Sequence, residues 1–327
     1  AAGVEVLMDR KYVEADVRIL TGLVESHLMA GASGGRKSIC PGLLGIESIR
    51  DFHGPRVLAD PRSADLVLHG NPCHGLSLEI AHMAPADFIL NVAVREDGAV
   101  TGVYAGDMEQ AHDRAVEELR RTVTMPMAHN YDVVVTHAGK VGVNHYQAAK
   151  AAAVAAKAVR PDGYVVLVAD TTDLDPIGSM HYRALMTLLK DIGHEAYERL
   201  IRSPDWTFVP DQWQTQMWSR VLARIPPSHL LYFSPQTPAY EYDRLPCRRP
   251  PTGDKGRQTQ PFSLQIQTFV SDALRTVTAE TSEPGVIQPH DAGERGKTRA
   301  GTPLPLVAFL PAGPYGIPVE ARNEAAQ

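Results

Sequence analysis

The chain has 327 residues, which is longer than one typical hydrophobic core supports, so two domains are expected. Its composition, with 44% hydrophobic and 21% charged residues, is that of a globular protein and excludes a fibrous or largely disordered chain. The net charge of -6 excludes nucleic acid and anionic membrane surfaces as main partners, because both require clustered positive charge. A small molecule is the expected ligand.

The spacing of the cysteines and the hydropathy of the chain exclude further classes of protein. Cys40, Cys73 and Cys247 lie far apart and form no Cys-x-x-Cys pair, so neither a disulfide scaffold nor a thiolate zinc site is expected. A cytoplasmic protein is predicted. No run reaches the roughly 18 apolar residues of a membrane-spanning helix, because Lys150 and Lys157 interrupt the stretch richest in Ala and Val.

The first domain is predicted over residues 1–126. A strand over 16–22 leads into a glycine-rich loop over 31–45. A second strand over 87–94 is followed by the turn Glu96-Asp97-Gly98 and by a hairpin partner over 99–104. Residues 108–121 have helical spacing, and Pro126 ends that pattern, so the domain boundary is placed there.

The second domain is predicted over residues 127–300. A strand over 131–136, an alanine-rich helix over 144–159 and a strand over 164–169 predict a right-handed parallel crossover. Helices over 178–200 and 211–224 lead into a further strand over 229–233. Residues 234–300 are rich in Pro, Gly, Arg and Gln and are expected to be partly irregular, with one helix near 269–277.

Residues 301–327 form the third predicted segment, with a last strand over 304–310 followed by a tail. This segment could pair with either domain, and it could therefore return to the first domain. The fold class that follows is α/β, with two α/β domains, the second containing parallel strand-helix-strand crossovers.

The densest group of chemically active side chains surrounds the glycine-rich loop. Glycines let successive backbone amides face an anion, and Arg36 beside Lys37 adds positive charge, so this loop suits a phosphate or a carboxylate. A lysine amine is also a nucleophile toward carbonyl groups. The neutral imidazole of His53 suits a borderline metal such as nickel, copper or zinc, and His27 adds a second imidazole to the group. Taken singly, each residue also fits a structural role, as a solvated lysine or a packed histidine.

The same loop nearly matches the P-loop pattern G-x-x-x-x-G-K-S. Arg36 occupies the position of the second glycine in this pattern, where the backbone would need a positive φ. Val165 to Asp170 resembles the strand and acidic residue that bind magnesium in nucleotide hydrolases. An ATPase or kinase is therefore the alternative function, and a cofactor-free binding protein is a third.

A second group lies at the start of the alanine-rich helix. Gln147 and Lys150 are three residues apart and share a helix face with Tyr146 nearby, so a carboxylate or phosphate would fit there, as would a solvated polar face. Trp213 carries an indole N–H that needs a partner when buried.

Together these segments resemble the lactate racemase family from about Val17 to Pro318. The main signature is His27, Lys37 and His53, ten and sixteen residues apart. Further similarity lies at Gly70 to His74, Phe88 to Val92, Ala105 to His112, Tyr146 to Lys150, and Trp213.

The resemblance implies a racemase or epimerase of 2-hydroxy acids that uses a nickel-pincer nucleotide, a pyridinium-3-thioamide-5-thiocarboxylic acid mononucleotide. Lys37 would hold it as a thioamide, and His53 would be the protein ligand of nickel. His27 would be a general base for the substrate hydroxyl, while the hydrogen on the 2-carbon passes as hydride to the pyridinium ring and gives a planar 2-keto acid. Catalysis would also involve Lys150.

The resemblance further implies that Tyr146, Gln147 and Trp213 bind the cofactor or the substrate, and that cofactor biosynthesis proteins are partners. The family has a further N-terminal region with an Asp/Arg-bearing motif and a second catalytic histidine, for which this sequence offers no counterpart before Ala1. Either the chain is a fragment, which the absent initiator Met favours, or the missing segment is supplied in trans. Residues 250–300 match the family poorly, and the pattern does not specify which 2-hydroxy acid is used.

Overall fold

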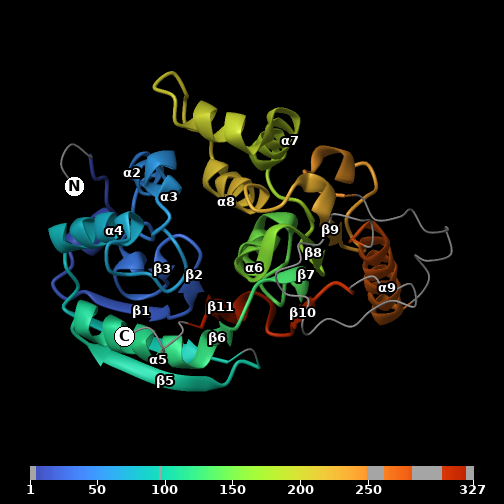
Figure 1. Ribbon diagram of the computed structural model, residues 1–327. Helices are drawn as coiled ribbons and strands as arrows, with labels where there is room; N and C mark the ends of the chain where they lie inside the picture. Colours follow the sequence, from blue (N-terminus) through green and yellow to red (C-terminus); the bar gives the residue numbers. More distant parts are fainter. Residues whose placement is uncertain (1–4, 96, 249–260, 282–303, 322–327) are drawn as a thin grey trace, which may run out of the picture. The chain divides into compact units, whose positions relative to one another are not determined.

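The structure is a computed structural model, and it describes residues 5–95, 97–248, 261–281 and 304–321 (Figure 1). The chain forms two compact units. Unit 1 is Ala1–Thr124 with Ile201–Phe208, and unit 2 is Met125–Leu200 with Val209–Gln327. Helices and parallel strands occur together, which confirms the predicted α/β class.

Unit 1 is built on a three-stranded sheet. β1 (Ile19–Leu23) runs parallel to β4 (Phe88–Val94), and β5 (Val100–Gly106) pairs antiparallel with β4, as the predicted hairpin requires. A two-stranded ribbon, β2 (Ser26–His27) and β3 (Gly31–Ala32), precedes the 3-10 helix η1 (Gly35–Ser38). The helices are α1 (Arg10–Val13), α2 (Ile46–Phe52), α3 (Pro55–Ala59), α4 (Pro72–Met83) and α5 (Met108–Val123).

The two faces of this sheet differ in burial. Leu20 and Ile89 point to one face and are buried with Ile39, Met108 and Ala111. The opposite face carries four apolar side chains that are 41% to 61% exposed: Ile19, Phe88, Leu90 and Val103. Strand pairing places them together, because Ile19 pairs with Phe88, Leu90 with Ala105, and Val92 with Val103. We call these four residues the open sheet face.

Unit 2 is built on a four-stranded parallel sheet with the order β10-β7-β8-β9. These strands are β7 (Tyr131–His137), β8 (Val159–Val168), β9 (Leu230–Phe233) and β10 (Val307–Leu310). The predicted crossovers are confirmed by α6 (His145–Ala158) between β7 and β8, and by α7 (Met180–Ile201) and α8 (Gln212–Leu222) between β8 and β9. α7 bends at Gly193, where φ is 77°.

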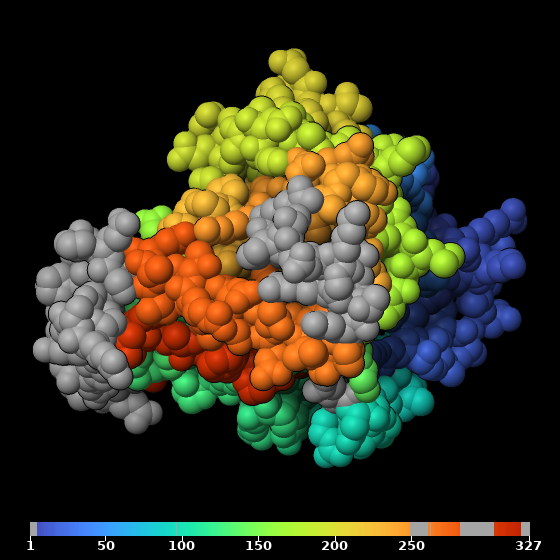
Figure 2. Space-filling view, turned by 90° about the vertical axis from the view of Figure 1, so that its right-hand side faces the viewer, coloured from blue at the N-terminus to red at the C-terminus, as the bar shows by residue number. Residues whose placement is uncertain are grey.

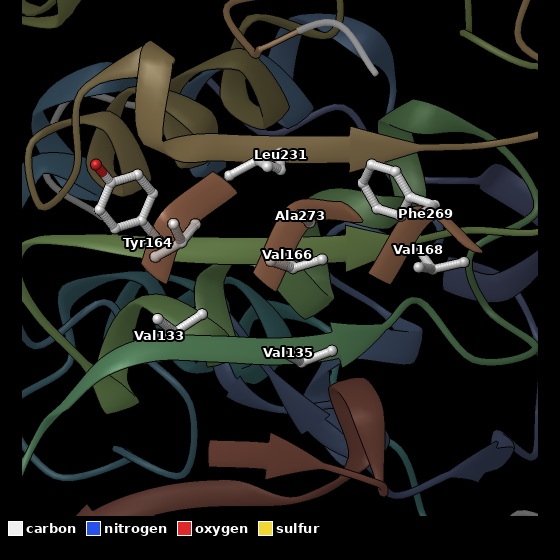
Figure 3. Close-up of a cluster of buried hydrophobic side chains, with 9 residues drawn as sticks. Val133, Val135, Tyr164, Val166, Val168, Leu231, Phe269 and Ala273 are labelled. Atoms are coloured by element: carbon white, nitrogen blue, oxygen red, sulfur yellow. The ribbon is translucent and has the colours of Figure 1, made fainter. Parts of the chain in front are cut away.

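The end of the described chain adds to unit 2. β10 pairs with β7, and β11 (Ile317–Glu320) pairs with β6 (Thr124–Met127). α9 (Phe262–Thr281) covers one face of the parallel sheet, and it is the orange helix in the surface view (Figure 2). Its Phe269, Ala273 and Val277 pack on valines of β7 and β8 (Figure 3).

Four helices of unit 1, α1 to α4, were not predicted from the sequence. Of the segment expected to be irregular, residues 249–260 and 282–300 lie outside the described residues. Among the helices that are described, none has the length and hydropathy needed to cross a membrane.

Candidate active site

The loop that carries Lys37 is fixed by two neighbouring elements of unit 1. Gly34 and Gly35 have positive φ angles of 76° and 53°. The Gly35 amide donates to Asn91 Oδ1 of β4 at 2.8 Å. A Cβ at Gly35 would lie 2.8 Å from the ring of His112 on α5. Glycine is therefore required here both by the backbone conformation and by the close approach of α5.

Arg36 anchors this loop from inside. Its side chain is buried, and the guanidinium donates to Ala30 O at 2.7 Å and to Ala32 O at 3.0 Å. Burial lowers the pKa of Arg36 to about 10. The sequence interpretation, in which Arg36 joins Lys37 in binding an anion, is corrected: this guanidinium holds backbone carbonyls of the β2–β3 ribbon.

His53 is placed by the end of α2. Its Nδ1 lies 3.2 Å from Ile49 O, and since a carbonyl only accepts, Nδ1 carries the proton. Its ring packs edge-on against Phe52 at 4.6 Å. Burial, and then the charge of Lys37, lower the pKa of His53 to about 3. His53 is therefore neutral at pH 7, with Nε2 as its unprotonated nitrogen, the state in which imidazole binds metals.

Two buried thiols lie in the field of the same cations. Burial raises the pKa of Cys73 to about 12 and that of Cys40 to about 11, although Lys37 and Arg36 act in the opposite direction. Both are thiols at neutral pH and not thiolate ligands. Among the residues that the structure describes, no group of three or more His, Cys, Asp or Glu side chains could hold a metal.

His27 has the opposite proton arrangement to His53. Its Nδ1 accepts from the Met29 amide at 3.2 Å and from the Ala30 amide at 3.1 Å. Backbone amides always donate, so the neutral ring of His27 carries its proton on Nε2. Unit 1 thus contains three of the predicted site residues, His27, Lys37 and His53, and the charge of Lys37 acts directly on His53.

The other four predicted residues lie in unit 2. Tyr146, Gln147 and Lys150 come from α6, which Asn144 caps by accepting from the Gln147 amide at 2.9 Å. Trp213 of α8 donates its indole N–H to Tyr146 Oη at 2.6 Å, so the structure brings these two together.

Gln147 also has an unmatched acceptor. Its Oε1 is buried and lacks a hydrogen-bond partner among the described residues. A buried acceptor of this kind fits a ligand that brings a hydroxyl or amide donor, because leaving it unpaired costs stability.

A buried aromatic network beneath Tyr146 was missed from the sequence. His145 stacks on Trp218 at 4.6 Å, and Tyr182 Oη lies 2.8 Å from His145 Nδ1 and accepts from the Trp218 indole at 2.7 Å. Burial lowers the pKa of His145 to about 3, so it is neutral and accepts from the tyrosine. The available signal was a histidine in the first turn of an alanine-rich helix, followed by Tyr182 and Trp218 on later helices.

The P-loop alternative lacks its structural elements. A P-loop joins a strand to an α-helix that begins at its lysine. Here Lys37 lies in η1, a 3-10 helix of four residues, and the positive φ angles fall on Gly34 and Gly35 instead of Arg36. The geometry therefore does not support nucleotide hydrolysis at this loop.

Comparison with known proteins gives two family matches. Residues 1–65 match the lactate racemase N-terminal domain, and residues 127–234 match the lactate racemase C-terminal domain. Together the two matches cover more than half of the chain, in the order in which the domains are named.

Two curated relatives are lactate racemases. The chain is 30% identical to that of Lactiplantibacillus plantarum over 71% of this chain and 54% of the relative, and 31% identical to that of Thermoanaerobacterium thermosaccharolyticum over 74% and 55%. The chain thus spans about half the length of the curated relatives it matches.

Solved structures agree in fold. The lactate racemase apoprotein from T. thermosaccharolyticum superposes with a TM-score of 0.76 at 24% identity, over 96% of this chain and 66% of that one. A protein from Thermotoga maritima gives a TM-score of 0.59 at 14% identity, over 96% and 69%. With both family domains matched and this fold shared, the chain belongs to the lactate racemase family.

Proposed function

We propose that this chain carries the catalytic core of an isomerase, a racemase or epimerase that inverts the 2-carbon of a 2-hydroxy acid. The observation that carries the proposal is that the charge of Lys37 acts on His53, a neutral imidazole whose Nδ1 donates to Ile49 O. One amine and one metal-binding nitrogen are thus presented by the same part of unit 1. The named activity of the curated relatives supports this choice.

The cofactor proposed is the nickel-pincer nucleotide. Lys37 would hold it covalently, and His53 would give Nε2 to nickel, which favours a square-planar field that includes imidazole. Such a group brings its own sulfur and carbon donors and needs one protein ligand. That requirement fits a site in which Cys40 and Cys73 stay protonated and no multi-residue metal group is found among the described residues. When bound, the cofactor would supply a hydride acceptor for the hydrogen on the 2-carbon.

The proposed substrate and cofactor contacts also include residues of unit 2. Lys150 is a cation suited to the carboxylate of a 2-hydroxy acid. The unmatched Gln147 Oε1 suits a hydroxyl of the substrate or of the cofactor ribose. Tyr146 and Trp213, already joined by a hydrogen bond, would present one aromatic surface to the cofactor. His27 of unit 1 would meet the substrate oxygen on the 2-carbon.

The remaining expectations belong to the same proposal. The cofactor biosynthesis proteins are proposed partners, the cytoplasm is the proposed location, and residues 1–126 and 127–300 are proposed as the functional domains. The hydroxy acid itself is left to substrate screening.

The test is the intact mass and nickel content of the protein produced together with the cofactor biosynthesis enzymes. We expect a nucleotide-sized mass increase and about one nickel per chain, both lost in Lys37→Ala because the covalent anchor is gone. Lys11→Ala, an exposed lysine of α1, is the matched control and should load fully. Adduct and nickel retained in Lys37→Ala would contradict the anchor assignment.

A second variant separates anchoring from metal binding. His53→Ala should keep the Lys37 adduct but retain at least about tenfold less nickel after dialysis, because one of its ligands is absent. His181→Ala, an exposed histidine of α7, should behave as wild type. Full nickel occupancy in His53→Ala would remove His53 from the metal site.

A further inference from the structure

The loop between β8 and α7 pairs with the first turn of α6. The His145 amide donates to Pro176 O at 2.8 Å, and the Tyr146 amide donates to Ile177 O at 3.1 Å. The next amide, that of Gln147, is held by the side-chain cap of α6. These amides are among those that a helix leaves unsatisfied at its start, and in α6 all three are already paired. A ligand at this end of α6 therefore contacts side chains and not these amides.

Arg183 of α7 holds the 173–178 loop in this position. Its guanidinium donates to both carboxylate oxygens of Asp175, at 2.6 Å each, and to Gly178 O. The same carboxylate accepts from the Ile177 and Gly178 amides at 3.0 and 3.2 Å. The hydrogen bond from Arg183 lowers the pKa of Asp175 to about 2, so the pair is charged at neutral pH. Because a bidentate charged pair fixes direction as well as distance, the loop carbonyls that face α6 are fixed with it.

Arg183 is itself anchored inside unit 2. Its side chain is 19% exposed, and its Nε donates to the buried Glu241 at 3.3 Å. The second carboxylate oxygen of Glu241 is buried without a hydrogen-bond partner among the described residues. An uncharged residue in place of Arg183 would leave this carboxylate unpaired, so lysine is the informative substitution.

α8 holds the same tyrosine that the loop holds. The Trp213 indole donates to the Tyr146 hydroxyl at 2.6 Å, and the Gln214 side chain donates to the Tyr146 carbonyl at 2.7 Å. The loop also approaches closely, since a Cβ at Gly178 would lie 3.4 Å from the Cβ of Tyr146. The amide, the carbonyl and the hydroxyl of Tyr146 are thus held by two other elements, and its orientation depends on both.

We propose that Arg183 is a positioning residue for the ligand contacts of α6. Through Asp175 it fixes the loop carbonyls that hold the first amides of the helix. It thereby sets the direction in which Tyr146 and Gln147 meet the bound hydroxy acid. Arg183 acts through these residues and takes no part in the chemical step. The proposal rests on the proposed function only where it names the ligand.

Amide hydrogen exchange tests this link without cofactor or substrate. Arg183→Lys keeps the charge but loses the bidentate fork. We expect the His145 and Tyr146 amides to exchange at least about tenfold faster than in wild type, because their carbonyl partners are no longer fixed. Ala152, buried in the same helix, should keep its rate. Arg199→Lys, at an exposed position of α7, is the matched control and should match wild type throughout.

Asp175→Ala provides a second variant, since this aspartate is half exposed and its loss leaves Arg183 paired with Glu241. It should accelerate the same two amides, whereas Asp191→Ala, at an exposed position of α7, should not. Unchanged exchange of the two amides in both variants would overturn the proposal. Equal acceleration at Ala152 would also overturn it, because the effect would then be a general loss of stability and not a local loss of position.

Kinetics of the loaded enzyme separates positioning from a purely structural role. Misplaced binding groups weaken the ground state and the transition state alike, so Arg183→Lys should raise KM about tenfold and change kcat less than about twofold. Arg199→Lys should behave as wild type. An unchanged KM in Arg183→Lys would overturn the link to substrate binding. Racemase activity absent even from wild type that carries the adduct would refute the proposed function and leave the exchange result standing.

Discussion

At Gly35 a single hydrogen atom in place of a side chain decides how the Lys37 loop is built. The φ of 53° is unfavourable for residues with a Cβ, and the His112 ring occupies the space that a Cβ would need. The same glycine offers its amide to Asn91. Conformation, packing and hydrogen bonding therefore coincide at one residue next to the proposed anchor.

We predict that Gly35→Ala lowers the free energy of unfolding by about 3 kcal/mol, from left-handed strain and overpacking together. Gly98→Ala is the matched control: its φ is 88°, but nothing lies within 4 Å of the point where a Cβ would stand, so only the conformational part, about 1 kcal/mol, should remain. Urea denaturation of the three proteins gives both values. An equal decrease in the free energy of unfolding in the two variants would show that the His112 ring moves aside without any loss of stability.

Among the elements, α9 shows how a segment distant in sequence completes the core of unit 2. Phe269 stacks on Phe233 of β9 at 5.0 Å, and Val277 is fully buried. Near the C-terminal end of α9, Glu280 accepts from Tyr164 Oη at 2.9 Å and from Arg248 at 2.8 Å. Apolar packing and one shared carboxylate therefore hold this helix on the sheet.

Removing the Phe269 side chain, which packs α9 on the sheet, should lower the stability of the protein. We expect Phe269→Ala to lower the free energy of unfolding by about 3 to 5 kcal/mol, the usual effect of removing a buried phenylalanine. Leu264→Ala, at a 42% exposed position of the same helix, should cost less than about 1 kcal/mol. Thermal or chemical unfolding followed by circular dichroism provides the measurement. A small effect at Phe269 would mean that α9 is not part of the cooperative core.

Elements with regular periodicity could be predicted, whereas helices with a weak local signal could not. The alternation of β4 and β5 around Gly98, and the alanine-rich α6 between two valine-rich strands, were predicted within a few residues. In contrast, α4 begins with the cap Asn71 and Pro72 but continues through Gly75, so its helical signal is weak.

Within the candidate site, residue types could be predicted but not their proton positions or burial. His27 and His53 are both histidines near glycines in the sequence, yet one accepts at Nδ1 and the other donates there. Arg36 beside Lys37 suggests a shared positive patch, but the ribbon carbonyls draw its guanidinium into the core. These properties depend on which backbone groups surround a side chain in three dimensions, and no local pattern encodes that.

For the molecule as a whole, buried neutral histidines link stability to pH. Burial lowers the pKa of His53, His112 and His145 to about 3 and that of His74 to about 4. In the unfolded chain these groups take up protons near pH 6.5. Because the folded pKa values are depressed, their contribution to stability is complete above pH 6.5 and is lost as the pH falls toward 3.

We therefore predict that the free energy of unfolding decreases from pH 7 to pH 5, with each fully neutral histidine contributing up to about 1.4 kcal/mol per pH unit. His145→Phe keeps the stacking on Trp218 but cannot titrate, so its unfolding energy should depend less steeply on pH than that of wild type. Urea denaturation at pH 7.5, 6.5 and 5.5 compares the slopes. Parallel slopes would mean that His145 takes up its proton in the folded protein as readily as in the unfolded chain.

The open sheet face of unit 1 affects how this chain behaves at different temperatures and in different salts. Attraction between exposed apolar side chains strengthens on warming and in sulfate, whereas attraction between surface charges weakens as salt is added. Association through Phe88 and Val103 would therefore be favoured by heat and by ammonium sulfate, and cold, low-sulfate buffers should keep the purified chain dispersed.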